Sequence, residues 1–352
     1  MERTRVAVVF GGRSGEHAIS CISAASIIRA LDRDRYEVLP VGITRDGRWM
    51  LAADDPAALE ARGRELPEVA DGREVAIVPG GWRDLDGGSG GAVTATVTEV
   101  DVVFPVLHGP YGEDGAIQGL LEMAGIPYVG AGVFASAAGM DKQHMKTMLA
   151  AAGVPIGAYT VVRPGEAPTL PGDGPWFVKP ARAGSSLGIS KVRRAQDIDA
   201  AVAEARRHDP KVLIEAMVHG REIECGVLDG NPPRVSVPAE IHVDPKHEFY
   251  DFEAKYLDGS STFDLPADLT PAQLGAMRTL ALQAFSAIDC AGIARVDFFL
   301  TADGPVVNEI NTMPGFTPHS MYPRMWAASG VEYPELLAHL LDLAVERGTG
   351  LR

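Results

Sequence analysis

Short apolar runs alternate with helix-like segments in the first third of the chain. Residues 5–10 (RVAVVF), 36–44 (YEVLPVGIT) and 101–107 (DVVFPVL) are nearly continuous apolar runs of strand length. One helix follows the first run, and another, over residues 115–125, follows the third. Strands that alternate with helices predict a doubly wound parallel sheet, whereas residues 52–100 have no regular pattern.

The pattern changes in the rest of the chain. After a helix over 140–153, short strands follow one another closely (WFVKP, GISKV, KVLIEAMV, REIECGVL and RVSVPAEIH), and this spacing predicts antiparallel sheets. Residues 246–266 are aromatic, charged and rich in turn residues, as in a long functional loop. Thr270 and Pro271 start a further helix, and a last helix begins near Pro334. We therefore expect an α/β part followed by an α+β part.

The segment 295–311 (RVDFFLTADGPVVNEIN) predicts a β-hairpin. The sequence ADG suits a three-residue loop in which Gly304 takes a left-handed conformation. Such a loop pairs Thr301 with Pro305 and sets the register of every other pair in the hairpin.

This register brings charged side chains together on one face, because side chains alternate along a strand. Asp297 then lies opposite Glu309, and Arg295 lies opposite Asn311. Two facing carboxylates repel each other unless a cation lies between them or one of them is protonated. Carboxylate and amide oxygens on one face indicate a Mg²⁺–nucleotide site, and a solvated polar face with an Arg–Glu pair is the alternative. Asn308 interrupts the other face, which is otherwise apolar and expected in the core: Val296, Phe298, Leu300, Val306 and Ile310.

Candidate nucleotide contacts occur earlier in the chain. Lys179 precedes a Gly/Ser loop whose N–H groups suit phosphate oxygens, although a plain glycine hairpin has the same pattern. Lys142 and Lys146 lie one helical turn apart, which by itself indicates a solvated helix face. Glu215 ends an apolar strand and Glu222 follows the next turn, an arrangement that suits adenine and ribose.

The first turn, VFGGRSGEH, is similar to a dinucleotide-binding turn but lacks the GxGxxG spacing. The second strand ends at Thr44 without the acidic residue that a ribose requires. Both features argue against a nicotinamide dehydrogenase. Glu16, just after the turn, suits either an ammonium ligand or the positive end of a helix dipole.

Composition narrows the class of protein. The net charge of −15 argues against nucleic-acid binding. The three cysteines form no pair or metal-binding spacing. The first apolar run is too short for a signal peptide or a membrane span, so we expect a cytoplasmic protein without a membrane partner.

The order of the motifs is more specific than any one of them. GG-x-S-x-E-H, HGPYGEDG, MDK, VKPARAGSSLG, FYDFEAKY, RVDFF and NEINTMPGFTPHSM together resemble the D-alanine–D-alanine ligases of the ATP-grasp superfamily. The resemblance extends from Val6 to Tyr322. It implies a Rossmann-like N-terminal domain over 1–130, a central ATP-grasp lobe over 131–220, and a C-terminal lobe over 221–352 with the metal site and a lid at 246–262.

The resemblance also implies roles for individual residues. Two Mg²⁺ ions, for which Mn²⁺ can substitute, would be bound by Asp297, Glu309 and Asn311. The phosphates of ATP would be contacted by Lys142, Lys179, Lys255 and the loop with Ser185 and Ser186. Its adenine would be contacted by Glu215, Met217 and Val218, and its ribose by Glu222. Asn308 would be a further contact with ATP. The two D-alanines would be contacted by Glu16, His108, Ser185, Tyr256, Arg295, Gly315, Ser320 and Met321.

In the implied reaction, ATP converts the carboxylate of one D-alanine into an acyl phosphate, and the amine of the second attacks it. Glu16, Ser185 and Tyr256 would hold the first ammonium group, while Arg295 and the Gly315 N–H would face the developing oxyanion. Tyr256 indicates an amine acceptor, because related ligases that use D-lactate have a histidine in this loop.

The same resemblance suggests a homodimer. Two other functions stay open: a different ATP-grasp carboxylate–amine ligase, and a nucleotide-binding module without catalysis. Glu16, Tyr256 and Ser320 suit amino-acid ends and favour the dipeptide ligase over the first. The complete set on the hairpin, with an arginine suited to an oxyanion, argues against the second.

Overall fold

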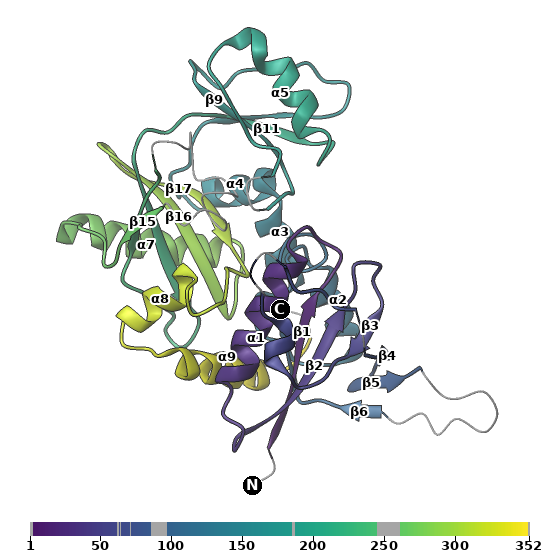
Figure 1. Cartoon of the computed structure of the whole chain (residues 1–352). Helices are drawn as coiled ribbons and strands as arrows, with labels where there is room; N and C mark the ends of the chain where they lie inside the picture. Colours follow the sequence, from purple (N-terminus) through teal and green to yellow (C-terminus); the bar gives the residue numbers. More distant parts are fainter. Residues whose placement is uncertain are drawn as a thin grey trace.

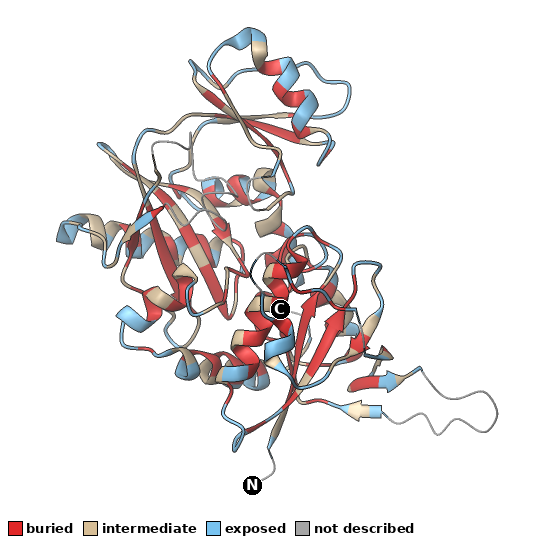
Figure 2. Ribbon diagram, in the orientation of Figure 1, coloured by how far each residue is buried: buried red, intermediate tan, exposed pale blue. Residues whose placement is uncertain are grey.

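The computed structural model describes residues 3–61, 63, 65–70, 72–85, 97–184, 187–244 and 261–350. Ser185, Ser186, Lys255 and Tyr256, which are candidate site residues, lie outside these ranges. Figure 1 shows three sheets, each with its own helices, and Figure 2 shows that the strands carry much of the buried surface.

The N-terminal sheet has seven strands in the order β6-β5-β4-β3-β2-β1-β7. The predicted parallel sheet is confirmed for β2-β1-β7. Antiparallel strands extend it: β3, and then β4 to β6 from residues 52–100, a stretch without a regular apolar pattern. The elements are β1 (Thr4–Gly11), α1 (His17–Ala30), β2 (Tyr36–Ile43), β3 (Trp49–Leu51), the 3₁₀ turn η1 (Pro56–Leu59), β4 (Arg73–Val78), β5 (Gly81–Asp84), β6 (Val97–Glu99), β7 (Val102–Pro105) and α2 (Ala116–Ala124).

The central lobe carries an antiparallel sheet in the order β10-β9-β11-β8, seen with α5 at the top of Figure 1. Two helices lead into it, and Asp141 caps the second by accepting the backbone N–H groups of Gln143 and His144 at 3.1 and 3.3 Å. The elements are α3 (Val133–Met140), α4 (Lys142–Ala151), β8 (Tyr159–Val162), β9 (Trp176–Pro180), β10 (Ser190–Val192), η2 (Ala195–Asp197), α5 (Ile198–Ala205) and β11 (Val212–Ala216).

The third sheet is antiparallel, in the order β15-β14-β12-β16-β17, with β13 paired to β12. Its helix α7 begins as predicted at Thr270, which forms a reciprocal capping box with Gln273. The elements are β12 (Arg221–Leu228), β13 (Arg234–Val235), β14 (Ala239–His242), β15 (Thr262–Asp264), α7 (Pro271–Ala287), β16 (Ile293–Thr301), β17 (Gly304–Asn311), α8 (Met321–Ala328) and α9 (Tyr333–Arg347).

The turn of the β16–β17 hairpin differs from the prediction. Thr301 pairs with Gly304 rather than with Pro305, so the turn contains two residues instead of three. A β-bulge between Asp297 and Phe298 then restores the expected pairing further along, with Asn308 as the extra residue. The register therefore confirms the two predicted pairs, Asp297–Glu309 and Arg295–Asn311.

The bulge also corrects the predicted core face of β17. Val307 is completely buried, whereas Val306, which was expected in the core, is only partly buried. The N–H group of Val307 donates to the carbonyl of Pro155 at 2.8 Å, so a contact with the chain before β8 holds the bulge in place. Asn308 breaks the alternation of the sequence because it occupies the bulge.

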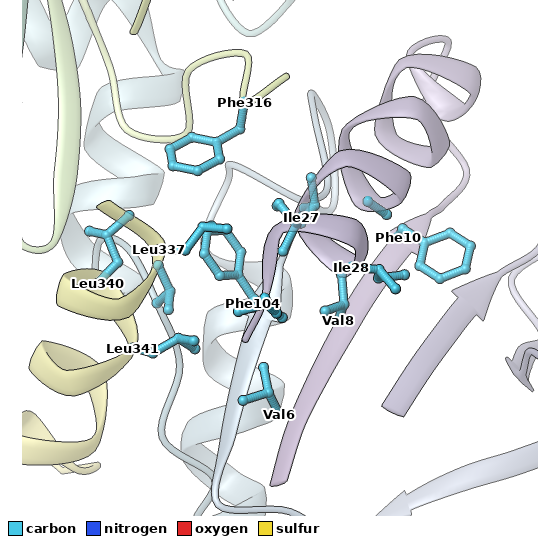
Figure 3. Packing of buried hydrophobic residues seen from close by; sticks show 14 of the residues in the cluster. Val6, Val8, Phe10, Ile27, Ile28, Phe104, Phe316, Leu337, Leu340 and Leu341 are labelled. Atoms are coloured by element: carbon cyan, nitrogen blue, oxygen red, sulfur yellow. The ribbon is translucent and has the colours of Figure 1, made fainter. Parts of the chain in front are cut away.

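One hydrophobic cluster joins the N-terminal sheet to the end of the chain (Figure 3). Val8 on β1 and Ile27 on α1 belong to it together with Leu337 and Leu340 on α9. Phe316, in the loop after β17, has its ring centroid 5.5 Å from that of Phe104 on β7. The cluster thereby fixes the loop after β17 against the edge of the first sheet.

Candidate active site

A cavity of about 850 Å³ is lined by residues of the second and third sheets, of α1 and α4, and of the loops that follow β1, β7 and β17. Every described candidate from the sequence lines it. These residues are Glu16, His108, Lys142, Lys179, Glu215, Met217, Val218, Glu222, Arg295, Asp297, Asn308, Glu309, Asn311, Gly315, Ser320 and Met321.

The acidic wall of the cavity is built around Arg295. Its guanidinium donates two hydrogen bonds of 2.7 Å to Asp297, and Nε lies 3.3 Å from a carboxylate oxygen of Glu224. Asn311 Nδ2 donates to Asp297 at 3.0 Å. Burial alone would lower the pKa of Arg295, but Asp297 and Glu224 hold it well above its ordinary value. The arginine is therefore charged and fixed in orientation.

Glu224 was not predicted from the sequence, although a signal was present. It lies opposite Asp297 in the pairing of β12 with β16, and it is two residues from Glu222 on the same face of β12. Glu224 is buried, and with Asp297 and Glu309 it brings the number of carboxylates around Arg295 to three. The surplus of negative charge and the carboxylate and amide oxygens suit a hard divalent cation.

The opposite wall carries lysines. Lys179 Nζ lies 2.7 Å from Glu215 Oε2, and the Nζ of Lys146 lies 3.5 Å from Glu215 Oε1. Burial acts to raise the pKa of Glu215, but the two lysines outweigh it and hold that pKa below its usual value. Lys142 Nζ donates to the carbonyl of Ala183 at 2.8 Å, at the start of the Gly/Ser loop. The side chain of Glu215 is thus shared by the two lysines.

Lys146 corrects the interpretation of α4 as a solvated face, because it is 1% exposed. Its spacing from Lys142 was visible in the sequence, but its burial depends on β11 and β17, which are distant in the chain.

The loops after β1 and β7 meet at Glu16. Ser14 Oγ accepts the N–H of Glu16 at 3.2 Å and donates to the carbonyl of His108 at 2.7 Å. A Cβ added to Gly109 or Gly184 would lie 2.9 or 3.1 Å from Glu16 Oε2, so glycine lets two backbone segments approach this carboxylate. The three segments form a small subsite around one negative charge.

Glu113, a second residue missed in the sequence, lies beside this subsite. Its Oε1 lies 3.9 Å from His108 Nδ1, and its Oε2 accepts the N–H of Gly109 at 3.0 Å. Burial acts to lower the pKa of His108, but Glu113 and Glu16 raise it above the ordinary value. The motif HGPYGEDG contained this signal, five residues after the histidine.

Ser320 and Met321 stand at the start of α8, on another side of the cavity. Ser320 Oγ accepts the N–H of Thr317 at 3.1 Å and lies 2.9 Å from Thr317 Oγ1. The N-terminus of a helix attracts carboxylates. Gly315 approaches this helix start closely, since a Cβ added to it would lie 3.1 Å from Ser320 Oγ. The carbonyl of its neighbour Phe316 accepts a 2.6 Å hydrogen bond from the Tyr333 hydroxyl.

The cavity has lysines on one wall and carboxylates with an arginine on the other, and two antiparallel sheets flank it. This arrangement is that of an ATP-grasp ligase. Family models described as "D-ala D-ala ligase N-terminus" and "D-ala D-ala ligase C-terminus" match residues 5–131 and 148–342. The chain belongs to the D-alanine–D-alanine ligase family.

Relatives and solved structures agree with this family. The chain is 57% identical to the D-alanine–D-alanine ligase of Rhodococcus opacus, over 99% of both chains. It is also 57% identical to that of Mycobacterium avium, over 100% of this chain and 99% of the relative. The structure is similar to the Coxiella burnetii ligase (TM-score 0.82, 35% identity, 99% and 95% covered). It is also similar to the VanG D-Ala:D-Ser ligase of Enterococcus faecalis (TM-score 0.83, 32% identity, 97% and 100% covered).

Proposed function

We propose that this protein joins two molecules of D-alanine in an ATP-dependent reaction that supplies a precursor of peptidoglycan. The observation that carries the proposal is the single cavity, in which lysines face an acidic hairpin and both are flanked by groups suited to amino-acid ends. Membership of the family supports the same reaction.

Each group of described side chains in the cavity has a separate part in the proposed reaction. Lys142 and Lys179 attract the phosphates of ATP. The γ-phosphoryl group passes to the carboxylate of the first D-alanine, which gives an acyl phosphate and ADP, and the amine of the second D-alanine then displaces inorganic phosphate. Glu16 pairs with the ammonium group of that D-alanine. Ser320 and the start of α8 receive the carboxylate of the second D-alanine, so that its amine points toward the acyl group.

Arg295 stabilises the oxyanion that forms when the amine attacks. The guanidinium is already held by Asp297 and Glu224, so little reorganisation is needed as charge develops. The Gly315 N–H is the second donor of this proposed oxyanion hole. Such preorganised donors often supply the largest single part of a rate enhancement.

We propose that two Mg²⁺ ions, for which Mn²⁺ can substitute, are held by Asp297, Glu309 and Asn311. The donor set fits, because carboxylate and amide oxygens are the ligands that Mg²⁺ takes in nucleotide sites. When bound, the ions would neutralise charge on the transferred phosphoryl group.

The acceptor needs a direct test, because one similar structure is named a D-Ala:D-Ser ligase. We expect phosphate release from ATP to be stimulated by D-alanine far more than by L-alanine, D-serine or D-lactate. Equal stimulation by L-alanine would contradict a D-alanine ligase and indicate another carboxylate–amine ligase. Release that no amino acid stimulates, with ATP still bound, would indicate a nucleotide-binding module.

Assembly and location are further proposals. Among the described residues no helix combines the length and apolarity needed to cross a membrane. We propose a cytoplasmic homodimer, with the domain boundaries 1–130, 131–220 and 221–352.

The neighbouring helices α2 and α3 expose Met123, Val133 and Phe134 at 88%, 42% and 56%, an apolar surface suited to a second copy. Sedimentation of Phe134→Asp as a monomer, beside a dimeric parent, would support this interface; an unchanged dimer would exclude it.

A further inference from the structure

Lys146 is a buried cation that none of the roles above uses. It projects from α4 one turn after Lys142 and reaches three other elements. Its Nζ lies 3.5 Å from Glu215 on β11, donates to the carbonyl of Asn308 on β17 at 3.4 Å, and lies 5.9 Å from the centre of the Tyr159 ring on β8. A fully buried lysine is costly unless such partners compensate for lost hydration.

The contact with Glu215 changes the charge that Lys179 presents to the cavity. Glu215 is shared, since one carboxylate oxygen faces Lys146 and the other faces Lys179. Two cations around one anion leave a net positive charge on this wall. Without Lys146, Glu215 would neutralise Lys179, and the attraction of this wall for phosphate would rest on Lys142 alone.

The contact with Asn308 has a second consequence. The carbonyl that Lys146 binds belongs to the bulged residue next to Glu309. One ammonium group therefore connects the strand with the proposed metal ligands to the strand that carries Glu215. This connection spans the two ATP-grasp lobes from the helix between them.

We propose that Lys146 is a positioning residue of the ATP site: it shares Glu215 with Lys179, so that Lys179 remains available to the phosphates. This inference rests on the proposed function. It predicts that the need for Lys146 disappears once Glu215 is neutral, a relation that a purely structural role does not produce.

The test is a double-mutant cycle with Lys146→Met and Glu215→Gln, in which binding of the ATP analogue adenylyl imidodiphosphate with magnesium is measured by calorimetry. Methionine keeps the length and apolar stem of lysine without its charge. We expect Lys146→Met alone to weaken binding by about tenfold or more. In the Glu215→Gln background, the same change should alter affinity by less than about threefold. The double variant should also bind more tightly than Lys146→Met.

The cycle remains decisive if Lys146→Met does not fold, because the comparison of Glu215→Gln with the double variant carries the same prediction. Equal losses in both backgrounds would overturn the inference, as would a Lys146→Met protein that binds the analogue normally. Lys211→Met is the matched control, since it removes another largely buried lysine of the same lobe, one that pairs with Asp141 instead. We expect this control to lower Tm while the affinity changes by less than about threefold.

The parent protein separates this inference from the proposed function. A parent that binds no ATP analogue would refute the proposed function itself. The other case is a parent that binds the analogue and forms the dipeptide. If Lys146→Met then weakens binding equally with Glu215 and with Gln at position 215, only the role of Lys146 would be refuted.

Discussion

At the scale of single residues, we expect a substitution of Glu309 to affect turnover much more than thermal stability. It faces Asp297 across the hairpin, and facing carboxylates repel each other when no cation lies between them. Glu309→Gln should lower turnover by on the order of 100-fold because a metal ligand is lost. Tm should change by no more than about 2 °C, because relief of the repulsion from Asp297 offsets the lost attraction to Arg295. Magnesium titrations of activity, with Tm measured in parallel, check both parts.

Asp303→Asn is the control for Glu309→Gln, because it removes the same charge at the exposed turn of the same hairpin. Its activity should stay within about twofold of the parent. Near-normal activity of Glu309→Gln at ordinary magnesium concentrations would contradict the proposed metal site.

The same residues show how far the sequence could predict this site. Alternation along two strands was enough to bring Asp297 opposite Glu309 and Arg295 opposite Asn311. The two-residue turn and the bulge were not predictable, because the bulge depends on the contact between Val307 and Pro155, which is distant in the sequence.

At the scale of elements, segments with a clear apolar pattern were predicted well, including the three-residue strand β10 within GISKV, whereas β3 and β6 were not predicted. The helix α7 and strands β1, β2 and β9 have sequences whose local pattern and caps match their structures. The short strands β3 and β6 have three residues each and are stabilised by neighbours in the sheet rather than by their own sequence. Tertiary pairing therefore determines the part of the first sheet that the sequence left undefined.

Asp209 allows a test at the scale of elements, because its side chain holds the segment between β9 and the Gly/Ser loop. Its buried carboxylate accepts the N–H of Arg182 at 2.9 Å, two hydrogen bonds from that guanidinium at 2.9 and 2.7 Å, and the N–H of Lys211 at 2.9 Å. Burial acts to raise its pKa, but these donors hold it below the ordinary value. The contribution to stability is thus complete above the unfolded-state pKa and is lost as pH falls through the folded-state pKa.

Asp209→Asn should lower the free energy of unfolding by about 2 kcal/mol at pH 7. The difference from the parent should stay constant between about pH 7 and 5 and shrink below about pH 4, where the Asp209 carboxyl becomes protonated first in the unfolded state and, at still lower pH, in the folded state. Urea unfolding at several pH values measures this. Asp197→Asn, in an exposed pair with Arg194, should cost less than about 0.5 kcal/mol. A difference that grows toward acid would contradict the assigned sign.

At the scale of the whole molecule, the cluster in Figure 3 connects stability with catalysis. Phe316 is fully buried, with its ring centroid 5.5–5.9 Å from those of Phe104, Tyr322 and Tyr333. Residues of the N-terminal sheet and of the helices α8 and α9 therefore hold the loop that carries Gly315. The N-terminal domain is in this way part of the support for the proposed oxyanion hole.

Phe316→Ala should lower the free energy of unfolding by about 3–5 kcal/mol and reduce kcat of the folded protein, because the backbone at Gly315 loses its support. Leu340→Ala, in the same cluster on α9, should cost a similar 2–5 kcal/mol but leave kcat unchanged. Tyr333→Phe creates no cavity and removes only the bond to the Phe316 carbonyl, so it should cost about 1–2 kcal/mol and still lower kcat several-fold. Thermal unfolding and initial rates below each Tm provide the comparison. If kcat falls with stability in the same proportion for all three variants, the cluster supports the fold as a whole and does not specifically position Gly315.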